Sequence, residues 1–244
     1  MVSRKLFKAI QGSTRPYTLS ALRKTYPRLE TLGDCLLKDK RVTDHIAVTS
    51  VSGADCSELG QDFIVIPDFI TELEHDDLVK ASEKKLKRLA TYDSDHIDNV
   101  IHNYRECQVS DWFPYEIAVN PIIDRVKALF SRDITFLPTH VLDLNDDGII
   151  KPHVDNLELS GSVIAGLCLV SDSVIKFQPL KEQDGLKFEV LAPKNCLYIQ
   201  RNSVRYNFTH AIPNDPHLRT FAGRRLENSR RISLIFRDLK PIFP

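Results

Sequence analysis

The sequence lacks several features that would assign it to a specialised class. Basic and acidic residues number 33 each among 244 residues, so no net charge favours phosphate contact with nucleic acid. No apolar run approaches the roughly 20 residues of a membrane span. The five cysteines are scattered without a Cys-x-x-Cys pair, which argues against a disulfide framework or a zinc site and indicates reduced intracellular thiols. What remains is one substantial globular core, for which 42% hydrophobic residues suffice.

The start of the chain has basic charge and no acidic residue before Glu30. Seven Lys and Arg residues precede it, Ser and Thr are frequent, and apolar side chains recur at helical spacing from Leu6 to Ile10. This composition predicts a mitochondrial transit peptide over residues 1–30, with a disordered basic arm as the alternative. Residues 31–60 are mixed and low in aromatic residues, which predicts a weakly ordered linker. The globular domain is then expected over residues 61–244.

Local signals predict two helices at the beginning of this domain. The apolar run 62–67 predicts a strand, and Thr71 with Glu74 forms a capping box that starts a helix running to about Leu89. Residues 93–115 are expected to form an irregular layer or a short strand. Asn120-Pro121 predicts the start of a second helix, with Asn120 as its cap.

From residue 139 onward the hydrophobic period becomes that of strands, and Asp146-Asp147-Gly148 signals a turn. The candidate strands are His140–Leu144, Ile149–Asp155, Ser162–Val170, Ser173–Gln178, Leu186–Ala192, Cys196–Ile199, Val204–Thr209 and Arg231–Phe236. Helices followed by about eight short strands predict a mostly β, α+β fold. Its core would be a double-stranded β-helix, or jelly roll, with the N-terminal helices packed on one face.

The stretch Lys151–Asp155 has the strongest chemical signal. On an extended strand the side chains of His153 and Asp155 point to the same side, which supplies two ligands of a two-His, one-carboxylate site for non-haem Fe(II). The pair also fits a solvated surface strand. His210, fifty-seven residues later, could be the third ligand if its strand lies beside that of His153. The residues that compete for this role are His96, His102, His140 and His217.

The strand from Arg231 to Arg237 alternates between apolar and polar residues. Ile232, Leu234 and Phe236 would face the core, while both arginines and Ser233 would face the other way. A buried guanidinium is costly unless it meets an anion, and its shape suits a carboxylate. The pattern therefore favours an anion clamp, with a solvated edge strand as the alternative. Iron with open positions needs a bidentate co-substrate, which 2-oxoglutarate supplies.

Together these motifs resemble the Fe(II)/2-oxoglutarate dioxygenases of the AlkB family, over about residues 62–240. The shared pattern is H-x-D, a distant His and R-x-x-x-x-x-R, and strings such as Pro152–Asp155 and Ile164–Leu167 resemble the mitochondrial branch. The resemblance implies Fe(II), 2-oxoglutarate and O2 as cofactors, with iron on His153, Asp155 and His210. It implies a co-substrate site of Tyr198, Arg231, Ser233 and Arg237, with Arg231 on the distal carboxylate and Arg237 near the keto acid end. Tyr198 also fits an ordinary core tyrosine.

Some features of repair-type AlkB enzymes are missing. No Asn-x-Tyr pair precedes the first ligand, where Asp143-Leu144-Asn145 stands, and no basic or aromatic insertion could form a lid for base flipping. We therefore expect an oxygenase of the mitochondrial matrix that hydroxylates a protein or small molecule. The resemblance links this branch to programmed necrosis and fatty acid metabolism.

Two other functions stay open at this point. An RNA demethylase of the same chemistry would need a basic stripe at the mouth of the barrel, whereas Asp143, Asp146, Asp147 and Glu158 suggest an acidic rim. Nucleic acid is thus a possible partner but not the favoured one. The other alternative is a metal-bound scaffold without catalysis. Arg205 fits a cation that contacts substrate, a cation that supports the metal ligands from behind, or a surface arginine at a strand end.

Overall fold

The computed structural model describes residues 46–50, 62–89, 91–96, 98–181 and 186–240. The expected transit peptide lies outside these residues. The strands are β1 Ile46–Ser50, β2 Phe63–Ile66, β3 Asp93–Asp95, β4 Ile101–Val109, β5 Thr139–His153, β6 Ser160–Leu169, β7 Ser173–Pro179, β8 Lys187–Ala192, β9 Leu197–Arg201, β10 Phe208–Ile212, β11 Thr220–Phe221, β12 Arg224–Arg225 and β13 Arg231–Leu239. The helices are α6 Glu72–Leu86, α7 Glu116–Lys127 and α8 Asn202–Asn207.

One long antiparallel sheet forms the body of the domain. Its strands follow the order β1-β8-β7-β10-β5-β13-β6-β9-β2, and β4 pairs with β5. The sheet folds over on itself, so that Phe63 of β2 meets Phe177 of β7 edge to face, with ring centroids 5.1 Å apart. Phe177 in turn stacks on Phe188 of β8 at 4.5 Å. Phe63 thus joins β2 to the neighbouring strands β7 and β8 of the other layer, which confirms the predicted jelly roll.

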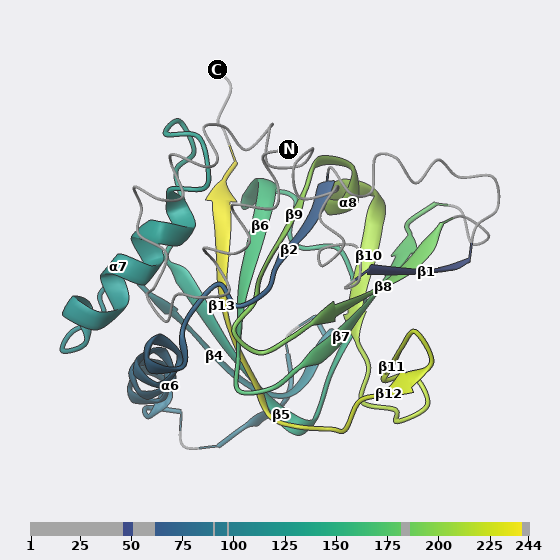
Figure 1. The fold of residues 1–244 in the computed structure, drawn as a ribbon, viewed down its shortest axis with the longest axis horizontal. Coiled ribbons are helices and arrows are strands. Elements are labelled where there is room, and N and C mark those ends of the chain that lie inside the picture. Colours follow the sequence, from purple (N-terminus) through teal and green to yellow (C-terminus); the bar gives the residue numbers. More distant parts are fainter. Residues whose placement is uncertain (1–45, 51–61, 90, 97, 182–185, 241–244) are drawn as a thin grey trace, which may run out of the picture.

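Helices α6 and α7 cover the outer face of the sheet, as predicted (Figure 1). Their buried side chains, such as Leu78 and Val126, form one core with Val141, Leu167 and Leu234 of β5, β6 and β13. Side chains of opposite parity on the same strands form a second core inside the barrel. In the part of the chain that the structure describes, no helix is long and apolar enough to cross a membrane.

The turn predicted at Asp146-Asp147-Gly148 is wrong, because β5 runs without interruption from Thr139 to His153. Gly148 serves a close approach between strands instead. A Cβ at this position would lie 2.9 Å from the backbone oxygen of Asn103 in β4. The pairing of β4 with β5 shifts register at the same place, and Asn103 has a positive φ of 53°. Between the pairs Tyr104–Leu144 and His102–Ile149, β5 has extra residues opposite Asn103, so the glycine lies in a β-bulge of β5 itself.

Two further boundaries differ from the prediction. Helix α7 begins at Glu116, so Asn120 is not its cap and Pro121 lies inside the helix. The buried Val119 lies in the added first turn, and its packing outweighs the hydrogen bond that the proline removes. The segment expected to be the strand Val204–Thr209 begins as helix α8, and the strand that follows is β10.

Strand β1 lies within the segment that the sequence suggests is a linker. It pairs with β8 in antiparallel register, with Ile46 opposite Val190 and Ala47 opposite Glu189. The remaining residues of 31–60 lie outside the described part of the chain. The sheet therefore includes backbone from before the predicted domain boundary at residue 61.

An ion pair fixes the first turn of α6. Thr71 and Glu74 form the predicted capping box, and Arg125 of α7 donates to both carboxylate oxygens of Glu74, at 2.8 and 3.0 Å. Burial alone would raise the pKa of Glu74, but the hydrogen bonds from Arg125 and Thr71 outweigh it and hold the pKa below its ordinary value. The pair therefore stabilises the packing of α6 on α7.

We expect Glu74→Gln to lower the free energy of unfolding by about 1–3 kcal/mol at neutral pH, because it leaves the buried Arg125 without its counter-charge. A lowered folded-state pKa contributes stability that is complete above the unfolded value of about 4.5 and is lost as pH falls through the folded value. The difference between the proteins, measured by urea denaturation, should therefore shrink in acid. Glu72→Gln, at an exposed site of the same turn, is the control and should have little effect. A constant difference down to acid pH would contradict the assignment.

Candidate active site

The structure brings the three predicted metal ligands together. Ligand atoms of His153, Asp155 and His210 all lie within 4.8 Å of one another, and this is the one group of its kind among the described residues. The rings of His153 and His210 have centroids 4.3 Å apart. Nε2 of His153 lies 3.7 Å from Oδ1 of Asp155. Two imidazoles and one carboxylate in this arrangement match the ligand set of non-haem Fe(II) oxygenases.

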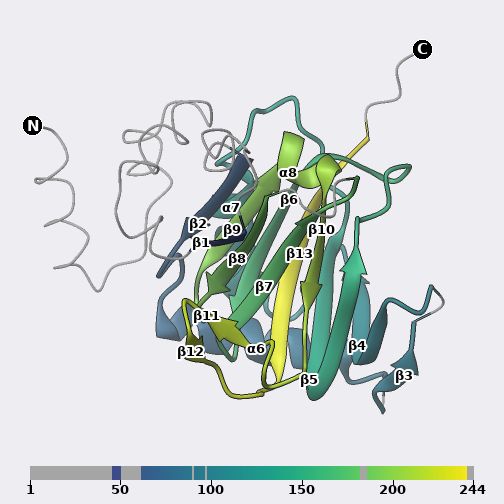
Figure 2. The ribbon, with the colours of Figure 1, turned by 90° about the vertical axis from the view of Figure 1, so that its right-hand side faces the viewer.

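Strand pairing places His210 against His153. The two residues are directly opposite each other in the antiparallel pair β10 and β5, which lie side by side with β13 (Figure 2). Asp155 lies beyond the end of β5. Arg205, of which 2% is exposed, holds this loop because it donates to the carbonyls of Asp155 and Asn156 and to Oγ of Ser160. Arg205 is therefore neither a surface arginine nor a free cation, and it fixes the loop that presents Asp155.

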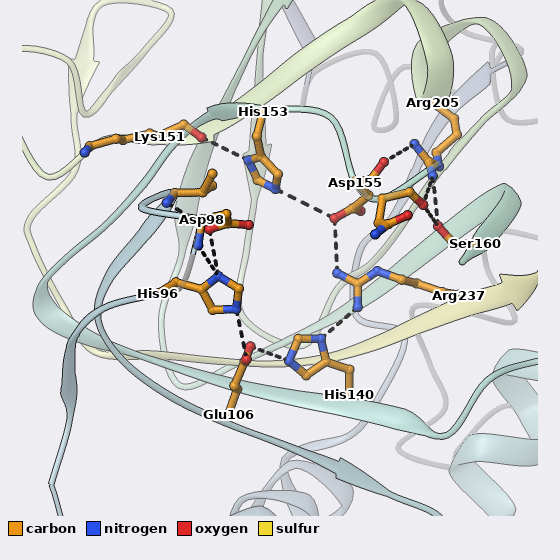
Figure 3. Close-up of polar contacts among 12 residues, drawn as sticks. His96, Asp98, Glu106, His140, Lys151, His153, Asp155, Ser160, Arg205 and Arg237 are labelled. Carbon is orange, nitrogen blue, oxygen red and sulfur yellow. Dashed lines mark hydrogen bonds and ion pairs between the residues drawn. The ribbon is translucent and has the colours of Figure 1, made fainter. Parts of the chain in front are cut away.

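The protonation states suit a metal ion. Nδ1 of His153 lies 2.9 Å from the carbonyl of Lys151 and donates to it, so Nε2 is the ring nitrogen that faces Asp155 (Figure 3). Burial would lower the pKa of His153, but the hydrogen bond and charge of Asp155 raise it above its ordinary value, so a metal ion bound at Nε2 takes the place of a proton. Burial and the neighbouring His153 lower the pKa of His210 to about 3, so its imidazole is neutral. Burial would raise the pKa of Asp155, but Arg237 and both histidines hold it well below its ordinary value. All three side chains can therefore act as ligands at neutral pH.

The predicted co-substrate residues lie on β13 and β9, the two strands that flank β6. Arg231 is 3% exposed and donates to Sγ of Cys168 at 3.8 Å. Burial raises the pKa of Tyr198 to about 12, against the lowering effect of the nearby charge of Arg231, so its hydroxyl stays protonated. A Cβ on Gly166 would overlap the ring of Tyr198. The absence of a side chain at Gly166 therefore gives the ring of Tyr198 room to approach the backbone of β6.

Two buried polar atoms beside Tyr198 have no hydrogen-bond partner in the part of the chain that the structure describes. They are Nε of Arg231 and Oγ of Ser233. No carboxylate pairs with Arg231 among the described residues. Burial and the nearby charge of Arg231 lower the pKa of a second buried guanidinium, Arg219. Unsatisfied donors around an unpaired buried cation fit a bound carboxylate, such as that of 2-oxoglutarate.

Arg237 lies at the metal end of the same strand. Its Nη2 donates to Oδ1 of Asp155 at 3.2 Å, and its Nη1 contacts Nδ1 of His140 at 2.7 Å. His140, one of the residues that competed for the third ligand position, thus reaches the site through Arg237 and is not part of the triad. Sequence reasoning missed this contact, and also the carboxylate of Glu106 behind His140. The matching parity of the three side chains on adjacent strands could have indicated it.

The acidic rim expected from Asp143 is wrong for that residue. Asp143 is fully buried and lies on the helix side of β5, opposite in parity to Leu142 and Leu144 of the inner core. Arg105 and Arg230 donate to its carboxylate at 2.5 and 2.9 Å. The carboxylate is therefore a structural ion-pair partner between β4, β5 and the start of β13.

Comparisons with known proteins agree with this geometry. No family model matches the chain. Alpha-ketoglutarate-dependent dioxygenase alkB homolog 7, mitochondrial, of Mus musculus is 41% identical over 194 residues, which are 78% of this chain and 85% of the mouse protein. The Bos taurus protein of the same name is 40% identical over 79% of this chain and 85% of its own length.

Solved structures share the fold. A prolyl hydroxylase from Trichoplax adhaerens, in complex with a peptide fragment of a hypoxia inducible factor, superposes with a TM-score of 0.55 at 10% identity. The match covers 87% of this chain and 90% of that chain, and it bears on the fold alone. The sequence match is the one that identifies the family. The chain belongs to the AlkB-homologue family of alpha-ketoglutarate-dependent dioxygenases.

Proposed function

We propose that this protein is a mitochondrial Fe(II)- and 2-oxoglutarate-dependent dioxygenase that hydroxylates a protein or a small molecule. The observation that carries the proposal is the pairing of two features in one barrel. One is the compact group of His153, Asp155 and His210. The other is the buried guanidinium of Arg231, which has no carboxylate partner among the described residues. A metal ion held by the triad and chelated by 2-oxoglutarate accounts for both features, because the distal carboxylate of 2-oxoglutarate pairs with Arg231.

Each side chain then has a definite role. His153, Asp155 and His210 hold Fe(II), while Arg231, Tyr198 and Ser233 bind the distal carboxylate of 2-oxoglutarate and Arg237 lies near its keto acid end. When bound, Fe(II) and 2-oxoglutarate supply the oxidation of a substrate C–H bond by O2, with succinate and CO2 as the other products. The barrel residues orient the co-substrate and exclude water from the reacting atoms.

The surroundings of the triad favour a protein or small molecule over nucleic acid. Leu157 and Leu159, in the loop after Asp155, are 44% and 63% exposed, and Tyr206 beside Arg205 is 40% exposed. Asp98 is exposed near His153, whereas the side chain of Lys151 points away from the triad (Figure 3). A phosphate backbone needs basic residues around the site, and apolar side chains suit a peptide or an organic substrate.

Location and physiology belong to the same proposal. The curated relatives are named mitochondrial, and the basic, acid-poor residues 1–30 support a matrix protein. Roles in programmed necrosis and fatty acid metabolism rest on the resemblance to this branch of the family.

The substrate class can be tested with a mitochondrial extract. We expect a protein or small molecule to gain one oxygen atom when the extract is incubated with the protein, Fe(II), 2-oxoglutarate and O2, as detected by mass spectrometry. The His153→Ala protein should give no such product, while His217→Ala, at an exposed position, should behave like the unaltered protein. RNA that loses methyl groups instead would establish the demethylase. A protein that releases no succinate with Fe(II) bound would be a scaffold.

A further inference from the structure

A line of hydrogen bonds leads from the metal ligand Asp155 across three strands to β4 (Figure 3). Arg237 donates to Oδ1 of Asp155 at 3.2 Å and contacts Nδ1 of His140 at 2.7 Å. Nε2 of His140 lies 2.8 Å from Oε2 of Glu106, and Oε1 of Glu106 lies 3.3 Å from Nε2 of His96. These contacts thus connect β13, β5 and β4 and end at His96, which precedes β4 in the sequence.

The donors and acceptors in this line fix one tautomer of His140. A guanidinium has donors only, so Nδ1 of His140 must accept from Arg237. The proton of the neutral ring is then on Nε2, which donates to the carboxylate of Glu106. The neutral imidazole of His140 therefore links the cation Arg237 to the anion Glu106. Because His140 has no charge, it does not neutralise Arg237, whose charge remains available to groups at the metal site.

Strand register makes the arrangement a rigid one. His140 of β5 is paired with Ile235 of β13 and with Gln108 of β4, so Arg237 and Glu106 are its diagonal neighbours on the inner face. The side chains of Arg237, His140 and Glu106 are 23%, 16% and 29% exposed. These side chains are therefore partly exposed, and none of them belongs to either apolar core.

The chemical type of His140 matters here. A carboxylate in its place would orient Arg237 but would also neutralise it, and an apolar residue would leave Nη1 without an acceptor. The imidazole orients the guanidinium and keeps its charge available. Arg237 can then face both Asp155 and an anion bound at the metal.

We propose that His140 is a positioning residue of this site. It holds Arg237 in the orientation that contacts Asp155 and receives the keto acid end of 2-oxoglutarate, and Glu106 holds His140 in turn. His140 reaches Asp155 through Arg237. This inference rests on the proposed function, because it assigns the orientation of Arg237 to co-substrate binding.

The test measures binding without turnover. The protein is loaded with Mn(II) in place of iron, and the Kd of 2-oxoglutarate is determined by calorimetry. We expect His140→Leu to raise this Kd about tenfold, as one lost charged hydrogen bond predicts. His140→Gln can accept from Arg237 and donate to Glu106, and it should restore the Kd to within about threefold. The Kd of Mn(II) alone, from electron paramagnetic resonance, should stay within about threefold in both variants, because the triad is intact.

His102→Leu is the matched control. The His102 side chain is 17% exposed and hydrogen-bonded to Asp95. It alternates with Ile101, which contacts the inner core, so it points away from that core. Its removal should leave the Kd of 2-oxoglutarate unchanged. If His140→Leu does not fold, Glu106→Gln provides the second variant. It removes the anion behind the imidazole and should raise the Kd by about threefold.

The possible outcomes distinguish a failure of this inference from a failure of the proposed function. If the unaltered Mn(II) protein does not bind 2-oxoglutarate, the proposed function fails, and the role of His140 fails with it. If that protein binds 2-oxoglutarate and His140→Leu binds equally well, only the role of His140 is overturned. Equal losses in His140→Leu and His140→Gln would overturn it too, since a side chain that only fills space would not distinguish them.

Discussion

Alanine in place of His153 or Asp155 should abolish the release of succinate from 2-oxoglutarate in the absence of any substrate, by more than about 100-fold. Each substitution removes one of the three ligand atoms that lie within 4.8 Å of one another. Two remaining ligands do not fix a metal ion that needs three protein donors to keep its open positions defined. Succinate release under Fe(II) and O2 is the direct measurement.

The fold should survive either substitution. The His153 and Asp155 side chains are 18% and 10% exposed and lie at and beyond the end of β5, outside both apolar cores. We expect the free energy of unfolding of the metal-free protein to change by less than about 2 kcal/mol. His217→Ala, at an exposed site, should keep full turnover. Turnover that persists in the His153 or Asp155 variant would refute the ligand assignment, and an unfolded protein would make these residues structural.

Replacing Arg231 with alanine should raise the KM for 2-oxoglutarate about 10- to 100-fold, or about 1.4–2.7 kcal/mol, through the loss of a charged, buried contact. Arg231 is 3% exposed, and its Nε has no hydrogen-bond partner among the residues that the structure describes. It is six residues away from Arg237 along β13, at the end of the strand away from the metal ligands. The affinity for Mn(II) alone should therefore stay nearly constant.

A second variant separates ligand binding from a structural role. Arg231→Met replaces a buried cation by an apolar side chain of similar length, which often leaves a protein as stable or more stable. The Tm of the metal-free protein should therefore hold or rise, while the rise in Tm on adding Mn(II) and 2-oxoglutarate should shrink. Arg224→Ala, an exposed arginine on β12, is the control. An equal loss of Mn(II) binding and 2-oxoglutarate binding would mean that Arg231 supports the fold.

Local signals in the sequence predicted the elements whose stability is local. The capping box of Thr71 and Glu74 starts α6 as expected, and the alternation in β13 separates Ile232, Leu234 and Phe236 of the outer core from Ile235 of the inner one. The pairing of His210 with His153 was expected from the need for a third ligand. Periodicity and chemistry together thus located the centre of the site.

The errors arose where contacts distant in sequence decide the structure. Gly148 was interpreted as a turn, because its close approach to Asn103 of β4 depends on a bulge that no local pattern indicates. His140 was one of several candidate ligands, because its partners Arg237 and Glu106 come from different strands. A sequence gives the residue types, but the register between strands decides which of them meet.

The pairing of β1 with β8 bears on where the proposed leader peptide could be removed. If it is removed at a point before Ile46, the backbone of β8 keeps its neighbour. Trimming after Ser50 would instead remove β1 and leave the amide and carbonyl groups of β8 without their partners on that side. Mature protein ends mapped by N-terminal sequencing should therefore fall upstream of residue 46.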